Sequence, residues 1–249
     1  MAKSSKRAEI KNICKKNGSA IITLVSKNGP LNFLGGQYVI FNSGLKTKDG
    51  KEIKRAYSIF SSDTQQEEFQ ICIQPVTGGL ISNHIPNLAI GSELEFSGPW
   101  GKFVENPNWP KKGKILLIAT DIGITTIHSI LHSLRWRDKL KDTYVLWYLF
   151  LKEKSISVQE ILKRLPEGFH FLNVISVSKI NHPNRPEECI RSLKEELVAF
   201  DFPQSAFLAG DGKLIRVAQD FLLKSGLDEK FIGTETFFNS TKKSEITSR

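Results

Sequence analysis

The second half of the chain alternates between apolar runs and helical patterns, and this alternation constrains the fold more than any other feature. Residues 114–119 form an apolar run that is typical of a strand buried on both faces. A helical pattern follows it, with Ile127, Ile130, Leu131 and Leu134 on one face. Further strands are predicted over 143–151, 170–176, 205–209 and 231–238, with helices over 157–165, 187–198 and 214–223. The order predicts a doubly wound parallel α/β sheet.

The first half has short strand-like runs and no convincing long helix. Strands are predicted over 8–14, 20–26, 38–41, 56–60, 68–74 and 93–97, and Asn17–Gly18 is a strong hairpin signal between the first two. This pattern predicts a small antiparallel β-barrel. We therefore expect a barrel domain over 1–106, a linker rich in breakers over 106–113, and an α/β domain over 107–239. The polar tail, 240–249, is expected to be disordered.

Composition excludes several classes of protein. Cys14, Cys72 and Cys189 lie far apart and form no CxxC pair, which argues against a zinc site, an iron–sulfur cluster or a disulfide framework. His128 and His132 have a metal-binding spacing, but no third ligand is evident, so we expect surface residues and no metal. No Gly-x-Ser-x-Gly elbow supports a hydrolase.

Location and charge give weaker indications. Neither a membrane span nor a secretory signal is evident, so a cytoplasmic location is expected. The net charge of +9 is compatible with binding to nucleic acid, with docking to an acidic electron carrier, or with an ordinary solvated surface. The basic residues are dispersed, which disfavours nucleic acid. Trp136, Trp147 and Tyr148 are expected to pack the second domain rather than to stack on bases.

Three segments of the first half carry candidate chemistry. In Arg55–Ala56–Tyr57–Ser58, strand alternation puts Arg55 and Tyr57 on one face, where an Arg can pair with phosphate and a Tyr can stack on a planar ring. In Gly78–Gly79–Leu80–Ile81–Ser82, the glycines allow close approach to an anion at a possible helix start. The third segment, 98–103, is a tight turn with an aromatic anchor. Taken singly, each is equally explained by ordinary structure.

Together and in this order, the segments resemble the ferredoxin–NADP reductase superfamily, and most of all the reductase modules of aromatic-ring oxygenases and phenol hydroxylases. The motifs are Phe33–Tyr38 at the opening, Arg-x-Tyr-Ser at 55–58, Gly-x-x-Ser at 79–82 and Gly-Pro-x-Gly-x-Phe at 98–103. The resemblance covers roughly residues 8–239. It implies that Arg55 contacts the FAD phosphate, that Tyr57 stacks on the isoalloxazine, and that Ser58 lies near its reactive edge.

The second domain departs further from the family pattern. The glycine-rich nucleotide loop becomes residues 120–126, in which Gly123, Ile124 and Thr125 fit, while two glycines and the proline are replaced. The family's Cys-Gly-Pro becomes Ala209–Gly210–Asp211, and its Glu-x-Phe survives at Glu235. Asp121 stands at a glycine position, where it either repels the dinucleotide's pyrophosphate or only caps a helix.

The resemblance implies a reductase with the cofactors FAD and NADP or NAD, in which NADPH or NADH passes a hydride to FAD and the reduced flavin delivers single electrons to a small acidic carrier such as a ferredoxin or flavodoxin. Ser178, Lys179 and Arg185 follow the third parallel strand, where relatives that prefer NADP carry Ser and Arg, and a solvated basic loop is the alternative. Two other functions stay open: an electron-transfer subunit with a decayed nicotinamide site, and a basic nucleic-acid-binding protein. The implied catalytic residues are Tyr57, Ser58 and Glu235, and the implied cofactor-binding residues are Arg55, Ala56, Tyr57, Ser58, Gly78, Gly79, Leu80, Ile81, Ser82, Thr120, Gly123, Ile124, Thr125, Ser178, Lys179, Gly210 and Asp211.

Overall fold

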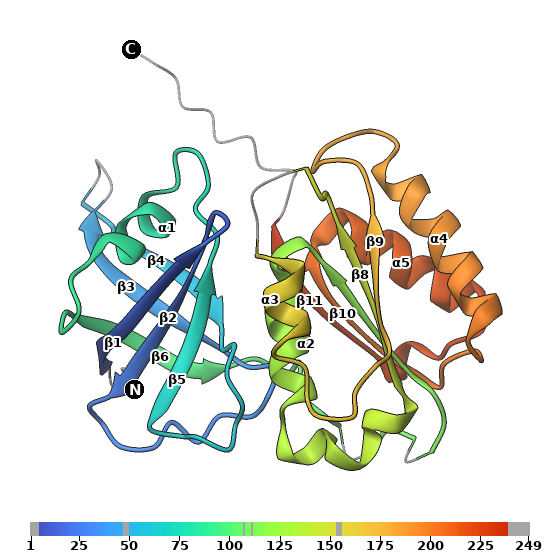
Figure 1. The fold of residues 1–249 in the computed structure, drawn as a ribbon, viewed down its shortest axis with the longest axis horizontal. Coiled ribbons are helices and arrows are strands. Elements are labelled where there is room, and N and C mark those ends of the chain that lie inside the picture. Colours follow the sequence, from blue (N-terminus) through green and yellow to red (C-terminus); the bar gives the residue numbers. More distant parts are fainter. Residues whose placement is uncertain (1–4, 47–49, 107, 111, 153–155, 239–249) are drawn as a thin grey trace. The chain divides into compact units, whose positions relative to one another are not determined.

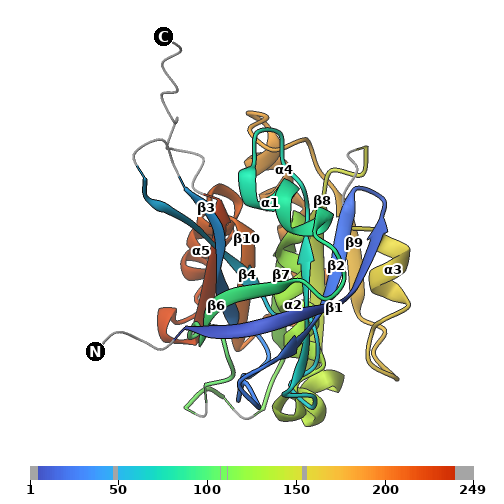
Figure 2. The same cartoon turned by 90° about the vertical axis from the view of Figure 1, so that its left-hand side faces the viewer.

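The computed structural model describes residues 5–46, 50–106, 108–110, 112–152 and 156–238. Its contacts divide the chain into two compact units, which we describe separately (Figures 1 and 2). The first unit comprises residues 1–107, 125–141 and 154–169, and the second comprises 108–124, 142–153 and 170–249. The predicted domain boundary between residues 106 and 107 stays a prediction, because residue 107 lies outside the described residues. The predicted tail over 240–249 also lies outside them and stays a prediction.

Six antiparallel strands form the sheet of the first unit, as the sequence predicts (Figure 1). The strands are β1 (Lys6–Lys16), β2 (Ser19–Ser26), β3 (Tyr38–Lys46), β4 (Glu52–Ser58), β5 (Glu68–Ile73) and β6 (Glu93–Trp100). Their order is β4-β3-β6-β1-β2-β5. The two end strands, β4 and β5, approach each other, and an Ile59–Ile71 bridge joins the chain at this point. The sheet is therefore barrel-like.

The predicted hairpin at Asn17–Gly18 is confirmed. Both residues have positive φ, 50° and 84°, and strands β1 and β2 pair on either side of them. Two consecutive positive φ angles define the turn type whose twist matches that of paired strands. The barrel interior is filled by alternating apolar side chains, among which the rings of Phe41, Phe69 and Phe96 contact one another.

Short helices complete the first unit. They are α1 (Leu80–His84), the 3₁₀ helix η1 (Ile85–Asn87), most of α2 (Ile124–Leu131), nearly all of η3 (Leu134–Asp142) and α3 (Val158–Leu162). The helical pattern predicted through Leu134 extends too far, because α2 ends at Leu131 and the side chain of Leu134 is exposed. Trp136, which we expected in the second domain, is buried within this unit's 125–141 segment.

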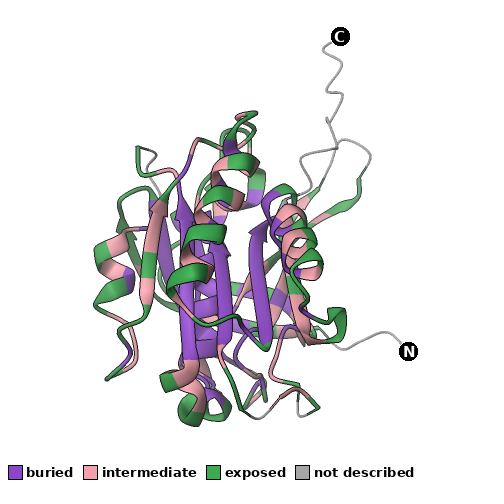
Figure 3. Ribbon diagram, turned by 90° about the vertical axis from the view of Figure 1, so that its right-hand side faces the viewer, coloured by how far each residue is buried: buried purple, intermediate pink, exposed green. Residues whose placement is uncertain are grey.

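Five parallel strands form the sheet of the second unit, which confirms the predicted α/β class. They are β7 (Ile115–Thr120), β8 (Thr143–Leu149), β9 (Leu172–Ser176), β10 (Ser205–Asp211) and β11 (Ile232–Phe238). The main helices are α4 (Arg185–Ala199) and α5 (Gly212–Lys224), with short turns η2 (Asp121–Gly123) and η4 (Glu229–Phe231). Every residue of β7, β8 and β10 is buried, as Figure 3 shows, which explains their unbroken apolar sequences.

The strand order β11-β10-β7-β8-β9 contains one change of direction along the described sheet. From β7, the chain builds outward through β8 and β9, then returns to the other side of β7 for β10 and β11. The carboxyl ends of β7 and β10 therefore mark the topological switch point, where open α/β sheets bind ligands. Separately, no helix within the described ranges is both long enough and apolar enough to span a membrane.

Candidate functional site

The Arg-x-Tyr-Ser segment lies on β4 as the sequence predicts. Arg55 pairs with Phe41 and Tyr57 with Val39 on β3, so both side chains share one face of the sheet. Arg55 is exposed, whereas Tyr57 is partly buried, with its ring 6.1 Å from that of Phe41. Burial raises the pKa of the Tyr57 phenol to about 12, so the ring stays neutral at physiological pH. A neutral aromatic ring beside a free guanidinium fits a ligand with a planar ring and phosphates.

Ser58 is oriented by a residue that the sequence analysis did not single out. The hydroxyl of Thr126, on α2, donates a hydrogen bond of 2.9 Å to Ser58 Oγ, and Thr126 is fully buried. Thr126 occupies the position where the family motif has proline, which has no side-chain donor. This departure from the family pattern therefore gives Ser58 a donor inside its own unit.

The glycine motif forms a tight turn into α1. A Cβ on Gly79 would lie 2.4 Å from Ser82 Oγ and 2.6 Å from Val76 Cγ2, so a larger residue there would displace these side chains. Gly78 has φ of +73° and open space around its Cα. Among the implied binding residues, Leu80 is exposed, whereas Ile81 packs into the barrel core and can offer a ligand only its backbone.

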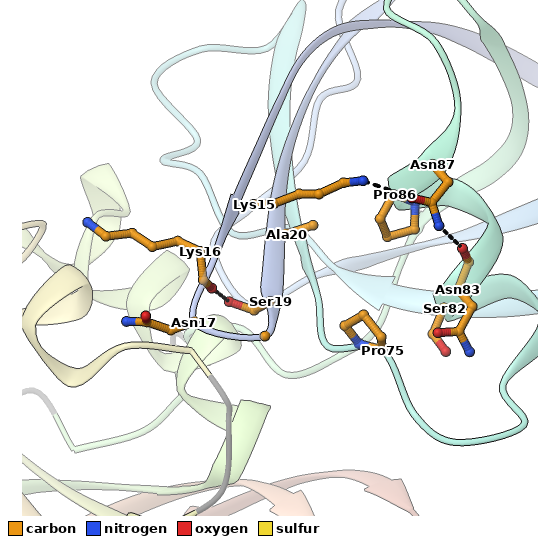
Figure 4. Close-up of a pocket in the computed structure, with 11 residues that line it drawn as sticks. Lys15, Lys16, Asn17, Ser19, Ala20, Pro75, Ser82, Asn83, Pro86 and Asn87 are labelled. Atoms are coloured by element: carbon orange, nitrogen blue, oxygen red, sulfur yellow. Dashed lines mark hydrogen bonds between the residues drawn. The ribbon is translucent and has the colours of Figure 1, made fainter.

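The fold brings these two motifs together. Helix α1 lies beside β4, although about twenty residues separate the motifs in sequence. Ser82 also borders a pocket of about 330 Å³ between α1 and the tip of the β1–β2 hairpin (Figure 4). Lys15 spans this pocket, and its Nζ donates to Asn87 Oδ1 at 2.8 Å. Arg55 and Tyr57 do not line this pocket; their guanidinium and neutral ring, with the glycine turn in the same unit, have the chemistry that a flavin dinucleotide requires.

Asp63 fastens the start of η3 to the barrel. Its buried carboxylate accepts hydrogen bonds from Gly35 N (3.1 Å), Ser133 Oγ (2.6 Å) and Leu134 N (3.0 Å). These bonds explain why the helical pattern fails at Leu134, whose backbone points inward while its side chain stays exposed. An acidic residue in a loop carries no periodic signal, so sequence patterns could not have identified this role.

His128 is buried, which makes the surface position that we expected for it wrong. Its ring stacks on Phe60 at 4.3 Å, with Nδ1 3.0 Å from Phe60 O and Nε2 3.1 Å from Arg164 O. The carbonyl contacts favour the protonated ring, but burial, together with repulsion from His132 and Arg164, lowers the pKa of His128 to about 3. The ring is therefore neutral at physiological pH and donates to one carbonyl at a time.

In the second unit, four implied binding residues meet at the switch point. A Cβ on Gly123 would lie 2.1 Å from Ala209 O, and one on Gly210 would lie 2.2 Å from Thr120 Oγ1. Asp211 N donates to Thr120 Oγ1 at 2.6 Å, and the Asp211 carboxylate caps α5 by accepting from Lys213 N. The backbones of η2 and β10 are thus in close contact, and glycine is required on both.

Asp121 has a partner that the sequence analysis did not consider, Arg185, and whether Asp121 repels a pyrophosphate stays a prediction. The Asp121 carboxylate is buried and lies 2.6 Å from Nη2 of Arg185, the first residue of α4. Asp121 has φ of +50°, a left-handed conformation that favours glycine. The indole N–H of Trp147 holds its backbone by donating to Asp121 O at 2.9 Å.

The loop after β9 holds Ser178 against a carboxylate. Both Ser178 N and Ser178 Oγ donate to Glu188, each at 2.7 Å, while Lys179 is exposed. The hydrogen bonds from Ser178 lower the pKa of Glu188, so it is ionised at neutral pH. Glu235 lies on β11, where its backbone is in register with Ala209 of β10.

The implied site residues thus fall into two groups, one in each unit. The first unit contains Arg55, Ala56, Tyr57, Ser58, Gly78, Gly79, Leu80, Ile81, Ser82 and Thr125. The second unit contains Thr120, Gly123, Ile124, Ser178, Lys179, Gly210, Asp211 and Glu235. Their individual roles toward a cofactor stay predictions.

Comparison with known proteins agrees with the site in the first unit. Residues 6–104 match the family described as oxidoreductase FAD-binding domain. NADH-cytochrome b5 reductase 1 of Candida albicans is 31% identical over 127 residues, covering 51% of this chain and 42% of the relative. Ferredoxin–NADP reductase B of Sorangium cellulosum is 34% identical over 122 residues, covering 48% of each. The chain spans about half the length of the first relatives it matches.

The same two-domain fold occurs in the cytochrome b5 reductase domain of Ulva prolifera nitrate reductase. The TM-score is 0.70 at 14% identity, and the alignment covers 93% of this chain and 97% of that one. These matches define the class: an FAD-binding oxidoreductase domain joined to a parallel α/β domain. Residues 6–104 accordingly form an FAD-binding oxidoreductase domain, and the fold of the chain is the two-domain fold of the reductase modules that the motif order implied.

Proposed function

We propose that the protein is an NAD(P)H-dependent FAD reductase that passes electrons to an external carrier protein. The observation that carries this proposal is the placement of the Arg55–Ser58 strand beside the Gly79–Ser82 turn, within a domain of the FAD-binding family. FAD, when bound, accepts a hydride from a nicotinamide and releases electrons singly. The protein itself supplies binding, orientation and charge.

Each motif residue of the barrel then has a defined task. Arg55, exposed on β4, pairs with a phosphate of FAD, and the neutral ring of Tyr57 packs against the flavin. Ser58, which accepts from Thr126, directs its own hydroxyl toward the flavin edge. The turn at 78–82 lets the backbone approach the pyrophosphate. We expect the released flavin to be FAD rather than FMN, because FMN has no pyrophosphate for this turn to bind.

The nicotinamide dinucleotide is proposed to bind at the carboxyl ends of β7 and β10. The sheet order makes this edge the switch point, and Gly123 and Gly210 allow the backbones of η2 and β10 to approach each other closely there. Ala209 stands where the family has cysteine, so no thiol is available there. Glu235, in register with Ala209 on the next strand, is the nearest implied catalytic acid on this edge.

We propose NADH rather than NADPH as the preferred donor, since Glu188 occupies the loop assigned to the 2′-phosphate. Ser178 offers two donors, but both are already directed at the Glu188 carboxylate. A 2′-phosphate would have to displace that carboxylate and would be repelled by it, whereas a ribose hydroxyl can donate to it. In the related nucleotide-binding fold, an acidic residue selects NAD in the same way.

Glu188→Gln tests this preference. The substitution removes the negative charge while keeping the shape, so kcat/KM for NADPH should rise about tenfold relative to NADH, equivalent to roughly 1.4 kcal/mol. Glu187→Gln, an exposed neighbour in the same helix turn, is the matched control and should leave the ratio unchanged. An unchanged ratio in Glu188→Gln, or a wild type that prefers NADPH, contradicts the assignment.

The carrier protein is proposed to be acidic, because the chain has a net charge of +9. Long-range attraction then accelerates encounter and is weakened by salt. A cytoplasmic location, expected from the sequence, stays a prediction. If bound flavin resists reduction by both NADH and NADPH, the chain is instead an electron-transfer subunit; if no flavin binds, the reductase proposal fails.

A further inference from the structure

A buried ion pair stands at the sheet edge where the nicotinamide dinucleotide is proposed to bind. We propose that Arg185 is a positioning residue that compensates the charge of Asp121 and so lets an acidic side chain occupy the nucleotide loop. The inference rests on the proposed function, because it takes the switch point as the nucleotide site. It concerns this chain in particular, since Asp121 replaces a glycine of the family loop.

The main chain at Asp121 is held in place, and Arg185 holds the carboxylate at 2.6 Å. Its φ of +50° fixes the left-handed conformation, and the Trp147 indole holds its carbonyl at 2.9 Å. Two residues later, Gly123 lies directly against Ala209 O, which fixes the path of the loop. The fixed loop and the ion pair with Arg185 together keep the carboxylate at the carboxyl end of β7, where the proposed function places the pyrophosphate.

The buried carboxylates at this edge are balanced in part by the guanidinium of Arg185. Asp211 adds a second buried carboxylate at the end of β10, and the Cys189 thiol is neutral, since burial raises its pKa to about 12. Arg185, also buried, contacts Asp121 directly. Without Arg185, the two phosphates of the dinucleotide would approach two carboxylates in a region of low dielectric, where repulsion is strong.

Arg185 acts through Asp121 and not by touching the nucleotide. Its side chain is 1% exposed, and its Nε and Nη1 atoms are buried with no hydrogen-bond partner among the described residues. Burying a guanidinium with so few partners is costly, so packing alone does not favour an arginine here. Balancing the Asp121 charge is the role that its one ion pair supports.

The test measures NAD⁺ and NADP⁺ affinity of the oxidised, FAD-loaded protein. Arg185→Met should weaken binding of the preferred nucleotide about tenfold, with kcat at saturating NADH changed less than about twofold. Asp121→Asn keeps an oxygen acceptor for Arg185 but removes the negative charge, so it should bind as tightly as wild type or tighter. In the double variant Asp121→Asn/Arg185→Met, the affinity for the nucleotide should return to within about threefold of the wild-type affinity.

The control is Arg216→Met, which removes an exposed arginine from α5 and should leave affinity unchanged. If the double variant binds as weakly as Arg185→Met, the pair has only a structural role and the proposal is overturned. Weaker binding by Asp121→Asn overturns it as well, and this arm holds even if Arg185→Met does not fold. If wild type binds neither nucleotide, the proposed function fails instead.

Discussion

The stability of the first unit should fall in mild acid because of His128. In the folded state, burial keeps the pKa of this ring at about 3, whereas an unfolded histidine titrates near 6.5. Between these values the unfolded state binds a proton that the folded state excludes. The pKa is lowered on folding, so stability is full above about pH 7 and is lost as the pH falls through 6.5 toward 3.

The magnitude follows from the two pKa values. At pH 5, about 1.5 units below the pKa of the unfolded ring, the unfolded ring is protonated and the folded ring is neutral. His128 alone should therefore lower the free energy of unfolding by about 2 kcal/mol relative to pH 7.5. Burial also lowers the pKa of His132, which adds to the loss in the same direction. A marginally stable domain has only about 5–15 kcal/mol in total, so the effect is measurable.

The assay is urea unfolding with excess FAD at pH 7.5 and pH 5.0. Wild type is compared with His128→Asn, which retains a donor but does not titrate, and with His170→Gln, an exposed control. The control should lose as much stability as wild type, whereas His128→Asn should lose about 2 kcal/mol less. Equal losses in wild type and His128→Asn would refute the assignment of this pH dependence to His128.

Three further predictions follow from named contacts. Asp63→Ala leaves two buried donors and one partly buried donor without their acceptor and should destabilise the first unit by about 3–5 kcal/mol in urea unfolding, whereas exposed Asp138→Ala should cost under about 0.5 kcal/mol. Thr126→Val should slow flavin reduction at saturating NADH while Thr126→Ser restores it; equal rates would exclude an orienting role. Reduction of an acidic carrier should slow steadily as salt rises in stopped-flow experiments, and a flat profile would exclude steering by the +9 charge.

The sequence predicts the strands well because their signals are local. The apolar run before Thr120 and the Asn17–Gly18 turn each report on a few neighbouring residues, and the structure confirms both. The helix predicted through Leu134 fails because a distant carboxylate, Asp63, captures the backbone at that point. Such a tertiary contact overrides a periodic pattern and leaves no trace in it.

In the candidate site too, the local motifs could be predicted from the sequence and the tertiary contacts could not. The Arg55–Ser58 and Gly79–Ser82 segments can be recognised in the sequence as short motifs, and folding brings them side by side. Arg185 and Glu188, which contact Asp121 and Ser178, both lie on α4. Arg185 is more than sixty residues from Asp121 in the sequence, so no local pattern links the two. A buried arginine at a helix start is indistinguishable in sequence from a solvated one, so only the fold identifies it.

The most direct test of the reductase proposal is an anaerobic absorbance spectrum of the purified protein before and after one equivalent of NADH. We predict a yellow protein whose flavin absorbance near 450 nm bleaches with NADH, and whose released flavin is FAD. A protein that binds no FAD, or whose bound flavin stays oxidised with both NADH and NADPH, would contradict it.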